Sequence, residues 1–194
     1  DGWCGDHGWP QGEPHLRCKQ PNFDQATHAP IRHSAPGTKP TNTTSPPEFI
    51  DLSPTLADLT GMSIPAQPDG KSLVPLRKKP EASVKEFSVS QYPRTRNTLD
   101  SERLGWSDGQ YMGYSIRTGQ YRYTIWMKDS FRSNKPYKKD LVEASELYDY
   151  KKDPNETVNV VGEKEYASVE KDMNEKMLHF LASQVKKISS IKRP

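Results

Sequence analysis

The feature that most limits the fold of this chain is a pair of strand-like segments, residues 111–117 and 121–128, separated by only three residues. Both segments are rich in aromatic and β-branched residues, which favour an extended backbone. A connection as short as residues 118–120 predicts an antiparallel β-hairpin. Residues 87–92 indicate a further strand and residues 146–150 a short edge strand, so we expect a small antiparallel sheet.

Two segments have helical periodicity. Residues 164–188 repeat apolar side chains along one stripe, which predicts an amphipathic helix that covers one face of the sheet. Residues 46–60 predict an earlier helix, with Ser45 as its N-cap and Gly61 after its last turn. Pro54 falls inside this pattern and should kink or restart the helix.

The composition argues against a self-sufficient core. A chain of 194 residues can bury one core of ordinary size, but this one has 17 Pro and a hydrophobic fraction of 32%. We therefore expect part of it to pack against a missing segment. The 28 basic and 25 acidic residues are interspersed, which argues against a nucleic-acid partner. No run approaches the roughly 18 apolar residues of a membrane span.

The residues most suggestive of chemistry lie near the start of the chain. Asp6 and His7 are adjacent and are flanked by Gly5 and Gly8. A carboxylate and an imidazole in this position can reach the same ion or polar substrate, and a hard cation such as calcium prefers oxygen ligands. Taken by itself, the pair is compatible with a binding site or with a solvated structural loop.

Residues 6–30 resemble the sulfatase pattern S-D-H-G-W-x-L-G-E-H-x-x-W-x-K-x-x-x-F-[DE]-x-A-T-[RH]-x-P. The matching positions are Asp6, His7, Gly8, Trp9, Gly12, Glu13, Lys19, Phe23, Asp24, Ala26, Thr27, His28 and Pro30. The resemblance implies that Asp6 and His7 help to hold one calcium ion. It also implies that His7 and Lys19 act on the sulfate ester as catalytic residues, and that Trp9 lines the sugar pocket.

Two further segments resemble sulfatases. Residues 51–61 with 69–73 are similar to D-L-x-P-T-L-x-x-L-x-G followed by G-x-S-L, and residues 146–159 to E-L-Y-D-L-x-x-D-P-x-E-x-x-N. The resemblance implies an α/β fold of the sulfatase or alkaline-phosphatase-like type. We expect residues 1–80 to be the last portion of the catalytic domain. Residues 81–194 should form a C-terminal subdomain with an antiparallel sheet and a packed C-terminal helix.

Residues 90–94 and 112–126 resemble the iduronate 2-sulfatase branch of the family. The implied activity is hydrolysis of 2-sulfate esters on iduronate in heparan or dermatan sulfate, with a sulfated glycosaminoglycan as substrate. We expect the aromatic side chains of these segments to pack, and Arg117 and Arg122 to pair with carboxylates. Arg103 is the candidate anchor for the uronate carboxylate, because a guanidinium can bind a carboxylate bidentately.

The chain departs from the family pattern in several places. The C-x-P-S-R segment that carries the formylglycine nucleophile is absent, as are the paired aspartates that complete the calcium site. We expect a missing N-terminal segment to supply both, and this chain alone to be inactive. Pro14 and Arg17 replace the His and Trp of the pattern. Arg32 and His33 stand where the family has a buried strand, and burying them unpaired would cost several kcal/mol.

A disulfide between Cys4 and Cys18 is sterically possible, but two cysteines do not make a disulfide framework, and we expect two free thiols. Glycosylation sequons at Asn42 and Asn155 fit a secretory-pathway protein, so we expect a lysosomal location, with secretion as the alternative. Two other functions remain open. One is a non-catalytic module that binds sulfated glycans, and the other is an alkaline-phosphatase-superfamily hydrolase that acts on phosphate or phosphonate esters.

Overall fold

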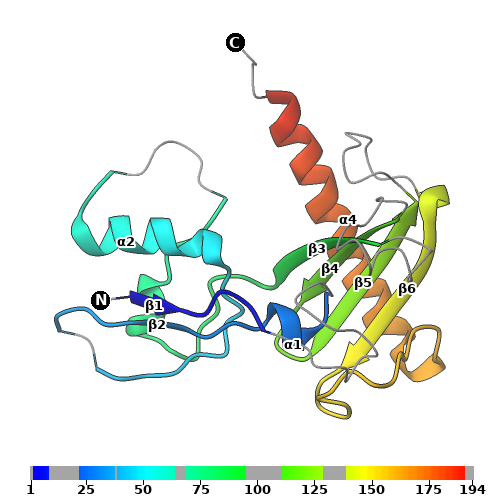
Figure 1. The fold of residues 1–194 in the computed structure, drawn as a ribbon, viewed down its shortest axis with the longest axis horizontal. Coiled ribbons are helices and arrows are strands. Elements are labelled where there is room, and N and C mark those ends of the chain that lie inside the picture. The colour runs from blue at the N-terminus through cyan, green and yellow to red at the C-terminus, as the bar shows by residue number, and fades with distance from the viewer. Residues whose placement is uncertain are drawn as a thin grey trace, which may run out of the picture.

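The computed structural model describes residues 2–8, 22–37, 39–63, 69–94, 111–128 and 139–190, with side chains of the last helix described to residue 184. Figure 1 shows a twisted sheet with a long C-terminal helix behind it. A smaller group of elements from the N-terminal part of the chain lies beside the sheet.

The predicted antiparallel sheet is confirmed. Its four strands are β3 (Ser88–Arg94), β4 (Tyr111–Arg117), β5 (Tyr121–Lys128) and β6 (Val142–Asp149), hydrogen-bonded in that order. Every neighbouring pair is antiparallel, and β4 and β5 form the expected hairpin. The edge strand β6 begins earlier than predicted, because its pairing with β5 continues past a register shift next to Trp126.

One face of the sheet is covered by α4 (Ala167–Ser190), which follows the 3-10 turn η4 (Lys164–Tyr166). The predicted amphipathic helix is therefore confirmed. Met173 and Met177 on its inner stripe are 1% and 0% exposed and belong to the same apolar cluster as Ile116 of β4. Full burial of each such side chain contributes roughly 1.5–3 kcal/mol, so this face of the sheet is structural core.

The earlier helix is shorter than predicted. The 3-10 turn η1 (Phe49–Asp51) passes into α2 (Leu52–Thr60). The expected restart near Pro54 is confirmed, because Pro54 lies in the first turn of α2, where its missing amide proton has no intrahelical partner to lose. Gly61 follows the last turn with a left-handed φ of 70°, as its position predicted.

The predicted N-cap of this helical segment was wrong. The hydroxyl of Ser45 instead accepts a hydrogen bond from the amide of Val84 at 3.3 Å. Glu48 takes the N-cap position, and its amide donates to the Asp51 carboxylate at 2.8 Å in a capping box. Asp51 is 0% exposed and also pairs with Lys85 at 2.6 Å, so a long-range ion pair holds the carboxylate that caps this helical segment.

The segments 51–61 and 69–73 form one structural unit. The amide of Lys71 donates to the Asp51 carboxylate at 2.7 Å, and the amide of Leu73 donates to the Thr55 hydroxyl at 2.9 Å. A Cβ at Gly70 would lie 2.0 Å from a backbone carbonyl oxygen of η1, so only glycine allows this approach. This part of the sulfatase-like pattern therefore holds α2 to the following loop.

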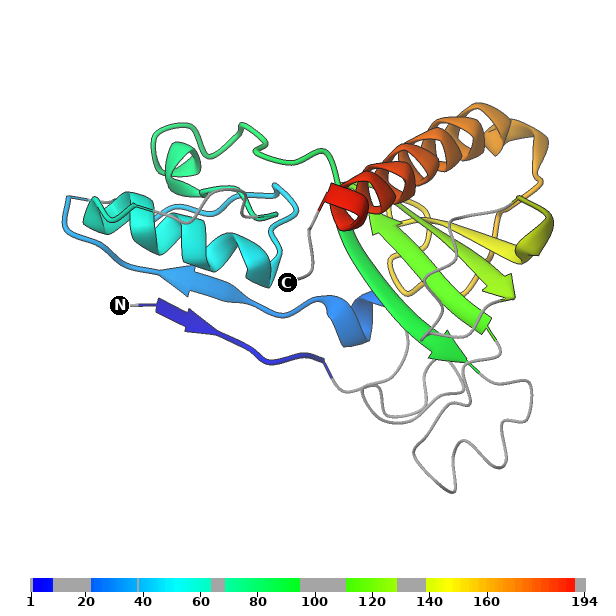
Figure 2. The same ribbon diagram turned by 90° about the horizontal axis from the view of Figure 1, so that it is seen from above.

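In the N-terminal part, β1 (Gly2–Cys4) pairs antiparallel with β2 (Ile31–His33), and α1 (Asp24–Thr27) precedes β2. Arg32 and His33 are exposed, so the expected cost of burying them does not arise. Figure 2 shows β1, β2 and α2 gathered on one side of the molecule and the sheet with α4 on the other.

Two further 3-10 turns, η2 (Val74–Arg77) and η3 (Lys139–Leu141), lie in the connections. Cys4 is an exposed free thiol, as predicted, whereas Cys18 lies outside the described residues. Within the described part of the chain, no helix has the length and apolar character needed to cross a membrane.

Candidate functional site

Asp6 and His7 directly follow β1 and are in contact. The imidazole Nε2 of His7 lies 3.0 Å from the Oδ2 atom of Asp6, and its Nδ1 lies 2.6 Å from the carbonyl oxygen of Gly8. Both ring nitrogens face oxygen atoms, which fixes the orientation of the imidazole. The Asp6 side chain is 87% exposed and that of His7 is 25% exposed, so the carboxylate is open to an ion or a substrate.

Close packing against α1 explains why a glycine, Gly8, follows this pair. The Gly8 amide donates to the carbonyl of Ala26 in α1 at 3.0 Å. A Cβ at this position would lie 1.5 Å from the carbonyl oxygen of Gln25, so a side chain cannot be accommodated. The segment that carries Asp6 and His7 is therefore packed tightly against α1.

The helix α1 in turn lies on the sheet face opposite α4 (Figure 1). Asn22, just before it, is 5% exposed. Its Nδ2 atom donates to the carbonyl of Gly113 in β4 at 3.2 Å, and its Oδ1 atom accepts from the hydroxyl of Ser90 in β3 at 3.3 Å. We call Asp6–Gly8 together with residues 22–27, against which they pack, the site segment. One buried amide thus fixes the site segment to two neighbouring strands.

Two arginines of the sheet complete the attachment. The Nε atom of Arg117 lies 3.2 Å from the Oδ1 atom of Asp24, and the amide of Asp24 donates to the carboxylate of Glu156 at 2.8 Å. Glu156 forms an ion pair with Arg122, and both side chains are 2% exposed. The prediction that Arg117 and Arg122 pair with carboxylates is confirmed.

The surroundings of this ion pair are largely apolar. The guanidinium of Arg122 lies 4.8 Å from the ring centre of Phe23 and 5.3 Å from that of Tyr148. The hydroxyl of Tyr150 donates to the Glu156 carboxylate. Burial raises the pKa of Glu156, although the charge of Arg122 opposes this. Glu156 also has a left-handed φ of 57°, which a non-glycine residue keeps only where tertiary contacts hold it.

The C-terminal pattern at residues 146–159 also has a structural role. The Asp149 carboxylate accepts a hydrogen bond from the hydroxyl of Tyr166 at 3.1 Å. The Oδ1 atom of Asn159 accepts from the amide of Leu147 at 2.9 Å. These contacts hold the turn after β6, and the turn holds Glu156.

Of the residues predicted for the site, the structure brings Asp6 and His7 together. Trp9, Lys19 and Arg103 lie outside the described residues, so their roles stay predictions.

Sequence reasoning missed the residues that anchor the site segment. Asn22 reaches a carbonyl that is 91 residues away along the chain, and Glu156 reaches an amide 132 residues away. The nearest signal was that Glu156 and Asn22 both lie inside segments that follow the family pattern, Asn22 at one of its variable positions. No periodicity relates residues so far apart in the chain.

Among the described residues, no three His, Cys, Asp or Glu side chains form a group suited to a metal ion. The exposed Asp6 carboxylate suits a calcium shell, which takes about 6–8 oxygen ligands, whereas both ring nitrogens of His7 face protein oxygen atoms. Other residues would have to supply the remainder.

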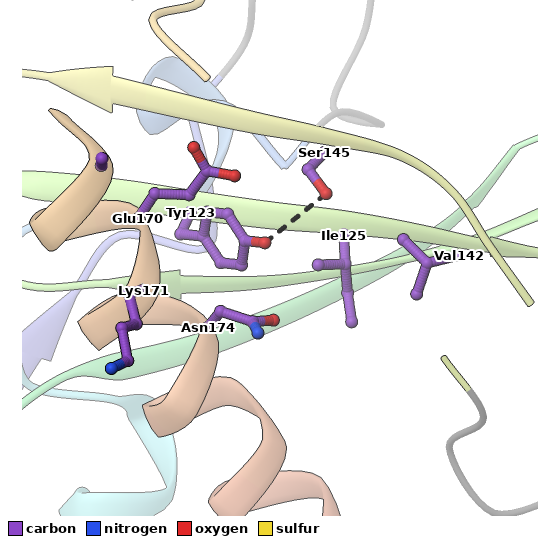
Figure 3. A pocket seen from close by; sticks show the side chains of 8 residues that line it. Tyr123, Ile125, Val142, Ser145, Glu170, Lys171 and Asn174 are labelled. Carbon is purple, nitrogen blue, oxygen red and sulfur yellow. Dashed lines mark hydrogen bonds between the residues drawn. The ribbon is translucent and has the colours of Figure 1, made fainter. Parts of the chain in front are cut away.

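A cavity of about 530 Å³ lies between α4 and the strands β5 and β6 (Figure 3). Tyr123 and Ser145 line it from the sheet, where their hydroxyls are 3.5 Å apart, and Lys171 and Asn174 line it from α4. Because α1 covers the opposite face of the sheet, this cavity is separate from the candidate site.

Residues 12–183 match the family model described as N-sulphoglucosamine sulphohydrolase, C-terminal. This chain belongs to the sulfatase family. The iduronate 2-sulfatase of Homo sapiens is 30% identical to it over 210 residues, which cover 80% of this chain and 37% of that protein. This sulfatase chain thus spans little more than a third of that relative's length.

Solved structures confirm the expected fold class. A 2-O glycosaminoglycan sulfatase superposes with a TM-score of 0.69 and 24% identity, covering 97% of this chain and 37% of its own. A phosphonate monoester hydrolase from Silicibacter pomeroyi superposes with a TM-score of 0.68 and 26% identity, covering 92% of this chain and 34% of its own. The sulfatase chain therefore has the predicted α/β, alkaline-phosphatase-like architecture, with an antiparallel C-terminal sheet and a packed helix.

Proposed function

We propose that this chain is the C-terminal part of a sulfuric ester hydrolase that removes the 2-sulfate from iduronate in heparan or dermatan sulfate. The observation that carries the proposal is the exposed Asp6 carboxylate held beside His7, within the segment whose residues follow the sulfatase pattern. The 30% identity to human iduronate 2-sulfatase supports a 2-sulfated uronate as the substrate.

In this proposal, Asp6 and His7 hold one calcium ion together with ligands from an N-terminal segment, and the ion supplies Lewis-acid polarisation of the sulfate oxygens. His7 also contacts the ester. Lys19 places an ammonium group on the same oxygens, where it offsets the charge that develops as the S–O bond breaks. Trp9 lines the sugar pocket, and Arg103 binds the uronate carboxylate.

We assign residues 1–80 to the end of the catalytic domain and residues 81–194 to the C-terminal subdomain. The contacts of Asp24 with Arg117 and Glu156 join these two parts. The sequon residues Asn42 and Asn155 are both exposed, which supports glycosylation and a lysosomal location, with secretion as the alternative.

The test is to read the transcript upstream of Asp1, express the complete protein and assay a fluorogenic iduronide 2-sulfate. We expect an in-frame C-x-P-S-R segment and paired aspartates, and turnover that Asp6→Ala reduces by at least about 100-fold. Because the Asp6 side chain is 87% exposed, that variant should keep its unfolding midpoint. Glu175→Ala, which removes an exposed carboxylate on α4, is the matched control and should keep full activity.

If the reading frame begins near Asp1, or if the complete protein binds the sulfated glycan without hydrolysing it, the enzymatic proposal fails. A non-catalytic module that binds sulfated glycans is then the better account.

A second candidate is a phosphate or phosphonate ester hydrolase. It is favoured by the superposition on the phosphonate monoester hydrolase, with its TM-score of 0.68 and 26% identity. Measuring kcat/KM of the complete protein for a sulfate ester and for a phosphonate monoester with the same leaving group separates the two. The sulfatase proposal requires the sulfate ester to be the better substrate.

A further inference from the structure

The sheet face that carries α1 presents three arginines from three different strands. Arg117 of β4 pairs with Asp24, and Arg122 of β5 pairs with Glu156. Arg94 of β3 differs from both, because none of the ion pairs within the described part of the chain includes it. Arg117 and Arg122 therefore help to hold the site segment through their ion pairs, whereas Arg94 does not.

An aromatic ring fixes the position of Arg94. Its guanidinium carbon lies 4.6 Å from the ring centre of Trp126 on β5, although β4 runs between the two strands. The ring can reach so far because Gly113 of β4 has no side chain, and a Cβ there would lie 2.5 Å from the Cζ3 atom of Trp126. The indole nitrogen donates to the Glu146 carboxylate at 2.9 Å, which fixes the orientation of the ring.

This arrangement lies beside the residue that anchors α1 to the sheet. Gly113 is in register with Trp126, and its carbonyl accepts the hydrogen bond from Asn22, which anchors the segment before α1. A Cβ at Gly113 would also lie 2.7 Å from the Nδ2 atom of Asn22. The Trp126 ring, which supports Arg94, and the Asn22 side-chain amide, which anchors α1, therefore both pack against Gly113.

Arg94 is a partly buried cation that stacks on a ring and forms no ion pair within the described residues. Burial lowers the pKa of its guanidinium, while the charge of Glu146 acts in the opposite direction. A guanidinium remains protonated in proteins and has five donor hydrogens, but stacking on a ring uses none of them. A partly desolvated guanidinium that forms no ion pair among the described residues gains most from a planar or tetrahedral oxyanion that accepts two hydrogen bonds.

We infer that Arg94, held on Trp126, is a binding residue for an anionic group of an acidic sugar, either the carboxylate of a uronate or its sulfate. The inference rests on the proposed function, since it assigns part of the substrate to a residue outside the Asp6–His7 segment. Both groups present two oxygen acceptors to a guanidinium, and the ligand set below distinguishes them.

The experiment is an NMR titration of the complete protein, in which the cysteine of any C-x-P-S-R segment is replaced by alanine so that no ligand is hydrolysed. The titration follows the indole N–H resonance of Trp126, assigned with Trp126→Phe. The ligands are iduronate 2-sulfate, its carboxyl-reduced counterpart and iduronate without sulfate. We expect Arg94→Gln to raise the dissociation constant for iduronate 2-sulfate by about tenfold or more, the value of a charge-assisted hydrogen-bonded pair. Arg94→Gln should not weaken binding of the ligand that lacks the recognised group.

Two further variants separate recognition from net charge and from folding. Arg94→Lys keeps the charge but loses the bidentate fork, so it should bind with intermediate affinity. Lys164→Gln removes one exposed charge from η4, on the α4 side of the sheet, and should change the dissociation constant less than twofold. The unfolding midpoint of each variant shows whether the fold is kept.

The inference is overturned if the complete parent protein shows no saturable shift, or if Arg94→Gln and Lys164→Gln weaken binding equally. It is also overturned if Arg94→Gln weakens binding of all three sugars to the same extent. These results leave the hydrolysis assay of the complete protein unaffected. Conversely, a complete protein that has no sulfatase activity but still recognises the sugar through Arg94 would refute the proposed function alone.

Discussion

Glu156 and Arg122 form a buried ion pair on the sheet face that carries α1, and each side chain is only 2% exposed. The same carboxylate accepts the amide of Asp24, so the pair connects the turn after β6 with the segment of the candidate site. Such a pair is weak evidence for net stability, but removing one partner leaves the other charge buried without compensation.

We therefore expect Arg122→Met to lower the free energy of unfolding by about 3–5 kcal/mol. The uncompensated Glu156 carboxylate is the physical reason, and urea unfolding at neutral pH is the measurement. The double variant Arg122→Met with Glu156→Gln should recover part of the loss. Losses that simply add would show that the two side chains are not coupled.

The turn after β6, which Asp149 holds at the end of that strand, should lose stability in acid. Burial acts to raise the pKa of Asp149, but hydrogen bonds from Gln120, the amide of Lys151 and Tyr166 outweigh it, and the pKa is lowered. A carboxyl with a lowered folded-state pKa contributes stability above its unfolded value of about 3.9 and loses it as the pH falls through the folded value.

Asp149→Asn should accordingly unfold at a lower temperature than the parent above about pH 5, and the difference should shrink below about pH 3. Thermal unfolding midpoints across that range test this. Parallel curves for parent and variant would contradict it, because the ionised carboxylate would then contribute nothing specific.

The glycine after the Asp6–His7 pair should not tolerate a methyl group. A Cβ at Gly8 would lie 1.5 Å from the Gln25 carbonyl oxygen, so Gly8→Ala must push the segment away from α1. We expect a loss of about 1–3 kcal/mol and faster hydrogen exchange in α1. Gly2→Ala is the control from the same segment, since nothing lies within 4 Å of its added Cβ.

Two threonines of α2 offer a matched comparison. The hydroxyl of Thr55 donates to the carbonyl of Asp51 at 2.6 Å and accepts from the amide of Leu73 at 2.9 Å, and this residue is 3% exposed. The hydroxyl of Thr60 donates to the carbonyl of Leu56 at 2.8 Å on the exposed side of the helix.

Thr55→Val should therefore cost about 1–3 kcal/mol, because the Leu73 amide loses its buried acceptor. Thr60→Val should stay within about 0.5 kcal/mol of the parent. Chemical denaturation of both variants measures the difference. Equal losses would mean that the bond to the 69–73 loop is unimportant.

The two sequons should both carry glycans when the protein passes through a secretory pathway. Asn42 and Asn155 are exposed in the structure. Asn42→Gln and Asn155→Gln should each remove one glycan from the intact mass, and the double variant should be insensitive to a glycosidase that releases N-linked glycans. An unmodified parent protein would argue against the lysosomal location.

Much of the fold could be predicted because its signals are local. The hairpin of β4 and β5 and the stripe of Met173 and Met177 on α4 both follow from residues that are near neighbours in the chain. The position of the Asp6–His7 pair next to glycines was likewise readable from the sequence. The predicted N-cap at Ser45 was wrong. The carboxylate that caps this segment belongs to Asp51, 6 residues further on, and its ion pair with Lys85 is a contact between distant parts of the chain.

The sequence by itself determined the family, the strands of the hairpin, the amphipathic helix and the Asp6–His7 pair, since each depends on contacts or spacings of a few residues. Only the tertiary structure decided that Asn22 and Glu156 fix the site segment to the sheet, and that Arg94 alone among the three arginines of that face forms no ion pair within the described residues. The physical reason is that these relationships depend on strand register and on which face each side chain occupies. A shift of one residue in the pairing of a strand would move its arginine to the opposite face, away from Asn22, Asp24 and Glu156.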